Sequence, residues 1–232
     1  MTPARRLLLA GLACWAVALP LGVASWVAQG PLPGDVGVTK ALQSAFGAEP
    51  EWAEFLTGTA KPPLVWFTLI VGAALAWAKA GWRGAIAVPI AFLIVYLTDK
   101  GLRASIYVPK PIAEYVPIAK FSESSGLPST FGLVFGAAFG AAALLPRVVR
   151  SRWGVPPRGL SLAATVIAGA LLVAGACCRT VLGGHWFSQM AASLTFAFGV
   201  TLLIGWVVWA WRPPVPVPAT PATPEAEQPA AS

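Results

Sequence analysis

The only histidine of the chain lies in the stretch Arg179-Thr180-Val181-Leu182-Gly183-Gly184-His185-Trp186-Phe187-Ser188-Gln189, between two long apolar runs. An arginine in apolar surroundings is costly unless it faces a polar site, so Arg179 is a candidate functional residue. The Gly183-Gly184 pair interrupts the helical period and predicts a tight turn between two spans. Arg179 would end one span and His185 begin the next, at a single membrane face. A cation beside an imidazole suits a phosphoryl group. The alternative is an interfacial histidine and an arginine that reaches the membrane surface.

The composition is that of an integral membrane protein. Of 232 residues, 57% are hydrophobic and only 11% are charged, against about 25% charged in soluble domains. The net charge of +7 is spread through apolar sequence, which argues against nucleic-acid binding. Cys14, Cys177 and Cys178 lie in apolar runs without metal-ligand spacing, so neither a disulfide framework nor a zinc site is predicted.

The apolar pattern predicts an all-α, six-helix membrane bundle with spans at 7–27, 64–78, 85–97, 129–145, 160–178 and 186–211. The first run also has features of a signal peptide, but it exceeds the usual core of about 7–15 residues, which favours a retained span. The fourth has small residues every four positions, which favours close helix packing: Gly132, Gly136 and Gly140. Residues 1–212 would form the membrane domain, and 213–232 a disordered cytoplasmic tail rich in Pro and Ala.

Two short amphipathic pieces interrupt the polar segment 30–63, one around Leu42 and Phe46 and the other around Trp52 and Phe55. Apolar residues at helical spacing between spans predict helices that lie in the membrane interface. Packing against the ends of the spans is an equal alternative.

Basic residues near the span ends predict the orientation. They fall on one side of a six-span chain, which the positive-inside rule assigns to the cytoplasm: Arg5, Arg6, Lys79, Arg83, Arg147, Arg150, Arg152, Arg158 and Arg212. Both termini would be cytoplasmic, in a bacterial-type inner or plasma membrane. The outer face would receive segments 30–63 and 99–128 and the turn that holds His185.

Three motifs meet on that outer face: Arg103-x6-Lys110-Pro111, Pro128-Ser129-Thr130-Phe131, and Cys178-Arg179-x5-His185-x3-Gln189. They resemble those of the type 2 phosphatidic acid phosphatase family, membrane lipid phosphatases related in their site to vanadium haloperoxidases. That family has Lys-x6-Arg-Pro, Pro-Ser-Gly-His and Ser-Arg-x5-His-x3-Asp. The resemblance is concentrated in residues 100–192, and the six spans extend it across the chain.

The resemblance implies an active site at the outer ends of spans three to six, without metal or cofactor. His185 would be the nucleophile that forms a phosphohistidine. The phosphate would be held by the other matched positions: Arg103 and Lys110 with their identities exchanged, Ser129, Arg179 as a bidentate clamp, and Lys100 as a possible further partner.

Two positions depart from the family's pattern. Phe131 replaces the histidine that protonates the leaving group, a step worth about 10²–10⁴ in rate. Gln189 replaces the aspartate that orients the nucleophile; it can accept a hydrogen bond from His185 but cannot stabilise an imidazolium by charge. Glu123 or Tyr107 could supply a proton, although no spacing places them.

We therefore predict a phosphatase or phosphotransferase that acts on an isoprenoid diphosphate or another lipid phosphate. A diphosphate is favoured because its leaving group, a phosphate monoester, departs without a proton. The alternative is an impaired or inactive relative that binds lipid phosphate head groups. A transporter fits less well, since no inverted repeat is evident.

Overall fold

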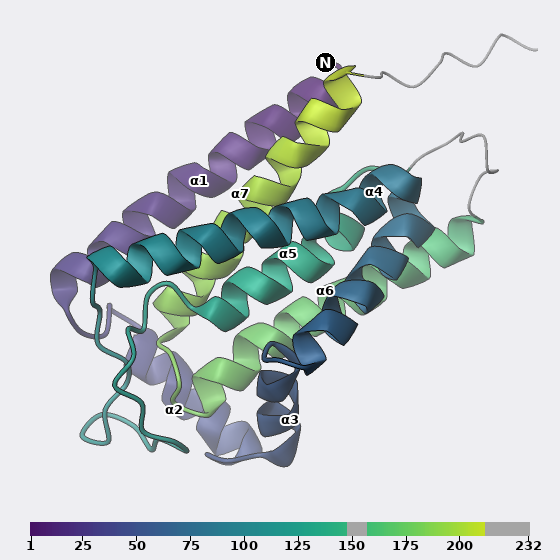
Figure 1. The fold of residues 1–232 in the computed structure, drawn as a ribbon. Helices are drawn as coiled ribbons and strands as arrows, with labels where there is room; N and C mark the ends of the chain where they lie inside the picture. The colour runs from purple at the N-terminus through teal and green to yellow at the C-terminus, as the bar shows by residue number, and fades with distance from the viewer. Residues whose placement is uncertain (148–156, 212–232) are drawn as a thin grey trace, which may run out of the picture.

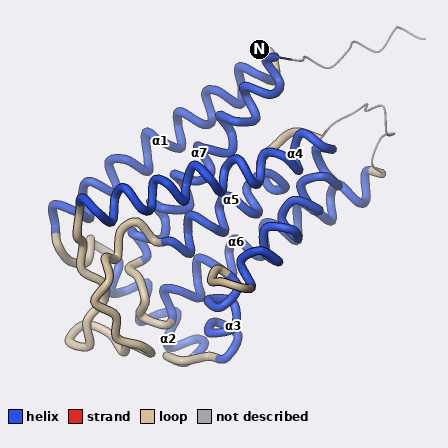
Figure 2. Tube along the Cα trace, viewed as in Figure 1, coloured by secondary structure: helices blue, strands red, loops and turns tan. Residues whose placement is uncertain are grey.

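The computed structural model describes residues 1–147 and 157–211, which contain helices and loops but no strand (Figures 1 and 2). The helices are α1 (Pro3–Ala28), α2 (Asp35–Phe46), α3 (Glu51–Thr59), α4 (Leu64–Ser105), α5 (Thr130–Leu144), α6 (Arg158–Val181) and α7 (Phe187–Trp211). Within these residues α1, α4, α6 and α7 are long and apolar enough to cross a membrane, and α5 is a shorter apolar helix. The predicted all-α, multi-pass membrane protein is confirmed.

Helix α5 is the centre of the bundle and packs against α4, α6 and α7. Every residue from Phe131 to Ala142 is buried. A Cβ on Gly72 of α4 would lie 2.2 Å from the Ala138 oxygen, and one on Gly136 would lie 2.5 Å from Ala197 Cβ. The neighbouring helices therefore approach so closely that only glycine fits at these two positions, as the small-residue spacing predicted.

Helix α4 covers two of the predicted spans and bends between them. Gly81 has φ 65° and ψ −159° inside an otherwise helical segment, a conformation that glycine adopts at little cost. The Trp66 ring packs against Phe92, with centroids 6.0 Å apart. Residues before the bend therefore lie beside residues after it, and α4 runs as two arms (Figure 1).

The second arm of α4 continues further than the sequence indicated. The third span was predicted to end at residue 97, but the helix ends only at Ser105. Asp99 is buried, and Arg103 one turn later approaches it, with Nε 2.9 Å from Oδ1. This ion pair lets a charged segment remain helical, so the predicted end of the span is wrong by about two helical turns.

Basic residues gather at the end of the bundle opposite the His185 turn. Lys79 Nζ donates to the Ala143 oxygen at the end of α5, and the Arg83 guanidinium lies 5.6 Å from the Trp209 ring in α7. The bend of α4 therefore lies with the last turns of α5 and α7. The predicted cytoplasmic residues Arg150, Arg152 and Arg212, and the predicted tail, fall outside the described residues.

Helices α2 and α3 pack against the end of α6 at the other end of the bundle (Figure 1). Gln43 of α2 donates to the carbonyl oxygens of Pro117 and Val181, at 2.8 and 2.9 Å. Of the two arrangements that the sequence left open, packing against the span ends is the one adopted.

Candidate active site

A tight turn joins α6 to α7 and places His185 between them, as the glycine pair predicted. The amides of Gly184 and His185 donate to the Arg179 oxygen at 3.0 and 3.2 Å. Gly183 has φ 60°, and a Cβ there would lie 2.6 Å from the Pro117 oxygen. A Cβ on Gly184 would lie 2.5 Å from Arg179 Nη2. Gly183 is therefore required by its backbone, and a side chain at position 184 would displace the Arg179 guanidinium that packs there.

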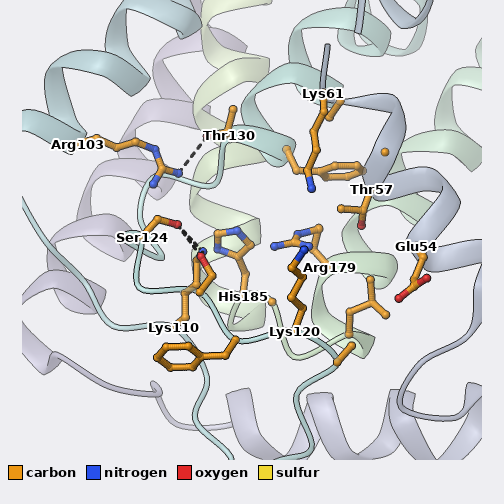
Figure 3. Close-up of a pocket in the computed structure, with 18 residues that line it drawn as sticks. Glu54, Thr57, Lys61, Arg103, Lys110, Lys120, Ser124, Thr130, Arg179 and His185 are labelled. Atoms are coloured by element: carbon orange, nitrogen blue, oxygen red, sulfur yellow. Dashed lines mark hydrogen bonds between the residues drawn. The ribbon is translucent and has the colours of Figure 1, made fainter. Parts of the chain in front are cut away.

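A cavity of about 590 Å³ opens beside this turn, lined by α3, α4, α5, α6 and the loop 106–129. Five cationic side chains line it, with Glu54 as the only acid: Lys61, Arg103, Lys110, Lys120 and Arg179. Figure 3 shows His185 between Lys110 and Arg179. Like charges held together repel each other, and an anion relieves that repulsion. Among the described residues no group of three or more His, Cys, Asp or Glu could hold a metal.

His185 is buried and held in one tautomer. Its Nδ1 lies 2.8 Å from the carbonyl oxygen of Gly126. A carbonyl only accepts hydrogen bonds, so Nδ1 carries the proton and Nε2 keeps its lone pair. Burial, followed by the charges of Arg179 and Lys110, lowers the pKa of His185 well below its usual value. The imidazole is therefore neutral near pH 7, which is the state of a nucleophile.

Arg179 lies in the last turn of α6, partly buried beside His185 (Figure 3). Its guanidinium has no hydrogen bond or ion pair to any other part of residues 1–147 and 157–211. A planar fork of unengaged N–H groups in a cavity is suited to bidentate binding of phosphate oxygens.

Arg103 also lines the cavity, but most of its N–H groups are used inside the protein. Nε donates to Asp99, Nη1 to the Ser125 oxygen at 2.9 Å, and Nη2 to the Pro128 oxygen at 2.6 Å and to Thr130 Oγ1 at 3.0 Å. This side chain therefore ties the loop 106–129 to α4 and α5. Its positive charge still faces the cavity.

Lys110 extends from the loop into the cavity and is half-buried. Its ammonium donates to Ser122 Oγ at 2.9 Å and to Ser124 Oγ at 2.6 Å (Figure 3). Burial, followed by the charges of Arg179, Arg103 and Lys61, lowers the pKa of Lys110 to about 8.

Two of the residues matched to phosphate binding lie away from the cavity. Ser129 is buried as the N-cap of α5; its amide donates to Ser193 Oγ and its hydroxyl to Met190 Sδ. Lys100 is exposed, with its ammonium 5.5 Å from the centre of the Tyr96 ring. Neither belongs to the cavity lining.

Gln189 does not take the place of an orienting aspartate. Its Nε2 donates to the Pro109 oxygen at 2.8 Å, and its Oε1 accepts from the Trp186 amide. His185 instead bonds to Gly126, where a Cβ would lie 2.6 Å from Gln189 Oε1. The buried Gln189 thus packs against Gly126, whose carbonyl orients the histidine, and bonds to Pro109 of the same loop.

Asp35 is a buried acid near the site that the sequence did not single out. Its Oδ1 accepts from the Ser188 amide at 2.8 Å, and its Oδ2 accepts from Ser188 Oγ at 2.7 Å and from the Leu32 amide at 2.8 Å. The first residue of α2 thus caps the start of α7, three residues after His185. No local pattern indicated this contact, nor the contributions of Lys61 and Lys120. Asp99, one helical turn before Arg103, was a readable signal.

The fold matches that of a solved membrane phosphatase, although its sequence has diverged. No protein-family model matches the chain, and the search of curated proteins found no match. The chain aligns with the crystal structure of a transmembrane PAP2-type phosphatidylglycerolphosphate phosphatase from Bacillus subtilis, with a TM-score of 0.58 and 19% identity. The alignment covers 84% of this chain and 93% of the other. The protein therefore has the fold of a PAP2-type membrane phosphatase, which confirms the expected resemblance at the level of the fold.

Proposed function

We propose that the protein is a divergent PAP2-type lipid phosphatase whose nucleophile is His185. The observation that carries this proposal is the bond from Nδ1 to the Gly126 oxygen, which leaves a neutral Nε2 lone pair in a cationic cavity. The lone pair attacks phosphorus, the leaving group departs, and a phosphohistidine forms. Water then attacks the phosphohistidine and releases phosphate.

Arg179 binds the non-bridging oxygens of the transferred group, where charge accumulates in the transition state. The guanidinium is pre-positioned by the packing of Gly184 against it. Lys110 and Arg103 add positive charge on the other side of His185.

The preferred substrate is an isoprenoid diphosphate. Five cations against one acid in the cavity suit a head group with two phosphoryl units better than one with a single unit. The leaving group of a diphosphate is also a stable anion, which fits a site with Phe131 in place of a histidine.

In the membrane, each arm of α4 would cross once, so that α1, the two arms, α5, α6 and α7 make six crossings. The positive-inside rule places the bend at Gly81 and both termini in the cytoplasm. The His185 cavity then faces the opposite side, where α2 and α3 cover the span ends.

Phosphate release from a panel of lipid monophosphates and diphosphates tests the proposal, with purified protein in lipid vesicles and His185→Ala as the control. We expect release by the wild type, none by His185→Ala, and an acid-labile, alkali-stable phosphoenzyme on the wild type alone. Release that is equal in both proteins would refute the assignment of His185.

A second candidate is a relative that binds lipid phosphate head groups without cleaving them. It is favoured by Phe131, which stacks on Phe135 at the cavity wall with ring centroids 4.1 Å apart. The same assay distinguishes the two: saturable binding of a lipid diphosphate without phosphate release identifies this candidate.

A further inference from the structure

A lipid monophosphate, unlike the preferred diphosphate, expels an alkoxide, so its cleavage needs a proton donor, and Phe131 cannot be one. Of the cavity-lining groups, His185 is the nucleophile, and arginine does not release its proton in proteins. Lys61, Lys120 and Glu54 are exposed side chains at the rim. Lys110 is the titratable side chain that lies half-buried beside His185.

The hydrogen bonds of Lys110 leave one donor available. An ammonium has three N–H groups, and two of them are directed to Ser122 and Ser124. The third makes no hydrogen bond to the described part of the chain. These two serines orient the ammonium, and the remaining N–H is available to an oxygen of a bound substrate.

Three cationic side chains from different parts of the fold act on Lys110 and favour loss of its proton. Arg103 lies on α4, Lys61 directly before α4, and Arg179 on α6; with burial they bring the pKa of Lys110 to about 8. A general acid works best when its pKa lies near the working pH. Lys110 stands where the family has an arginine, which would keep its proton, so this exchange supplies an acid that the family's pattern lacks at this position.

We propose that Lys110 is the general acid that protonates the leaving oxygen, an inference that rests on the proposed phosphoryl transfer to His185. As the Nε2–P bond forms and the P–O bond breaks, a proton passes from Nζ to the departing oxygen, and a neutral alcohol leaves. The neutral Lys110 amine then accepts a proton from the water that attacks the phosphohistidine. This step restores the Lys110 ammonium and the free histidine and releases inorganic phosphate.

The experiment compares two substrates that share an alkyl tail, an alkyl phosphate and an alkyl-substituted nitrophenyl phosphate. Nitrophenolate is a good leaving group and needs no acid, whereas an alkoxide does. Lys110→Arg keeps the charge but cannot deliver the proton. We expect it to lower kcat on the alkyl phosphate by roughly 10²-fold or more, and on the nitrophenyl phosphate by less than about 10-fold. Retained nitrophenyl activity also shows that the variant is folded.

Lys120→Arg is the matched control, because Lys120 lines the same cavity from the same loop. Lys120→Arg should change kcat on both substrates by the same factor. An equal loss on both substrates in Lys110→Arg, or no loss on either, would overturn the proposal and leave Lys110 as a phosphate-binding group only. If Lys110→Arg is unfolded, Ser122→Ala with Ser124→Ala replaces it and should show the same selective loss on the alkyl phosphate; its absence overturns the proposal. A wild type that cleaves a lipid diphosphate but neither monophosphate would also overturn the proposal, whereas a wild type inactive on all three would refute the proposed function itself.

Discussion

The Nδ1 atom of His185 lies 2.8 Å from the main-chain oxygen of Gly126, 59 residues earlier in the chain. A carbonyl oxygen orients an imidazole without adding a full negative charge. The ring is therefore fixed in one tautomer, while burial and the neighbouring cations keep it neutral. In this protein a loop carbonyl replaces the aspartate that the family's third motif would supply.

Gln189→Asp should reduce activity rather than restore it. Phe131 and Gln189 are the two departures from the family's motifs, so the sequence alone would predict that Phe131→His with Gln189→Asp rebuilds a complete site. However, the Gln189 amide donates to Pro109, and a carboxylate there has no N–H to give. A buried acceptor without its donor costs roughly 1–3 kcal/mol, so we expect a lower Tm and a lower kcat. A gain in kcat from Gln189→Asp alone would show that the carboxylate reaches His185.

Phe131→His should raise turnover on an alkyl phosphate, and more strongly when Lys110 is arginine. Phe131 lines the cavity, so a histidine there could give a proton to the leaving group. If Lys110 already supplies that proton, the gain is small in the wild-type background and approaches about 10² in the Lys110→Arg background. Equal gains in the two backgrounds would mean that Lys110 is not the acid.

Arg179→Ala should abolish tight binding of vanadate, a mimic of the phosphoryl transition state. Charge-assisted hydrogen bonds contribute about 1.5–3 kcal/mol each, so we expect Kd to rise by at least roughly 10-fold. Lys110→Ala should weaken binding in the same direction. Lys100→Ala is the control, since Lys100 lies outside the cavity. Unchanged vanadate affinity in both Arg179→Ala and Lys110→Ala would refute the assignment.

The pH profile of kcat/KM on an alkyl phosphate should be limited by two groups. On the acid side activity falls only well below pH 6.5, because the lowered pKa of His185 keeps the nucleophile neutral above that range. On the alkaline side activity falls as Lys110 loses its proton near pH 8. In Lys110→Arg the alkaline fall should disappear, since arginine does not titrate there. An unchanged alkaline limb in that variant would assign it to another group.

Asp35→Ala should destabilise the start of α7. It removes the three hydrogen bonds that Asp35 accepts from Ser188 and Leu32, at a cost of roughly 1–3 kcal/mol. Thermal unfolding in detergent should show a Tm several degrees lower, with a smaller shift for Asp35→Asn. Lys40→Ala, at an exposed position of the same helix, should leave Tm unchanged. An unchanged Tm in Asp35→Ala would show that the cap adds no stability.

The helices and the central turn were predictable because they depend on local sequence. Apolar runs and the Gly183-Gly184 pair placed α6, α7 and His185 within a few residues of where they lie. The spacing of the first and third motifs also identified Arg179 and Lys110, which the fold brings to the same cavity. Ser129, which the motif match assigned to phosphate binding, is instead the N-cap of α5.

The contacts that tune the site were not predictable, because they depend on the path of the chain between helices. The loop 106–129 supplies the Gly126 carbonyl that bonds to His185 and the Pro109 carbonyl that accepts from Gln189. No periodic pattern in the sequence describes the course of this loop. Asp35 reaches Ser188 across 153 residues. Such contacts follow from tertiary packing, which a single sequence does not reveal.

Because α5 is enclosed by its neighbours, its positions tolerate few substitutions, whereas other parts of the cavity lining tolerate more. Residues 131–142 of α5 are all buried, and its packing leaves no room for a methyl group at Gly136 or at Gly72 of the neighbouring α4. The cavity walls formed by α3 and residues 112–121 are mostly exposed or half-buried and meet few such limits, whereas Lys110 and residues 122–129 hold or orient side chains of the site. New substrate preferences should therefore arise by changes in the walls. A laboratory library aimed at altered lipid specificity should randomise these segments and leave α5 intact.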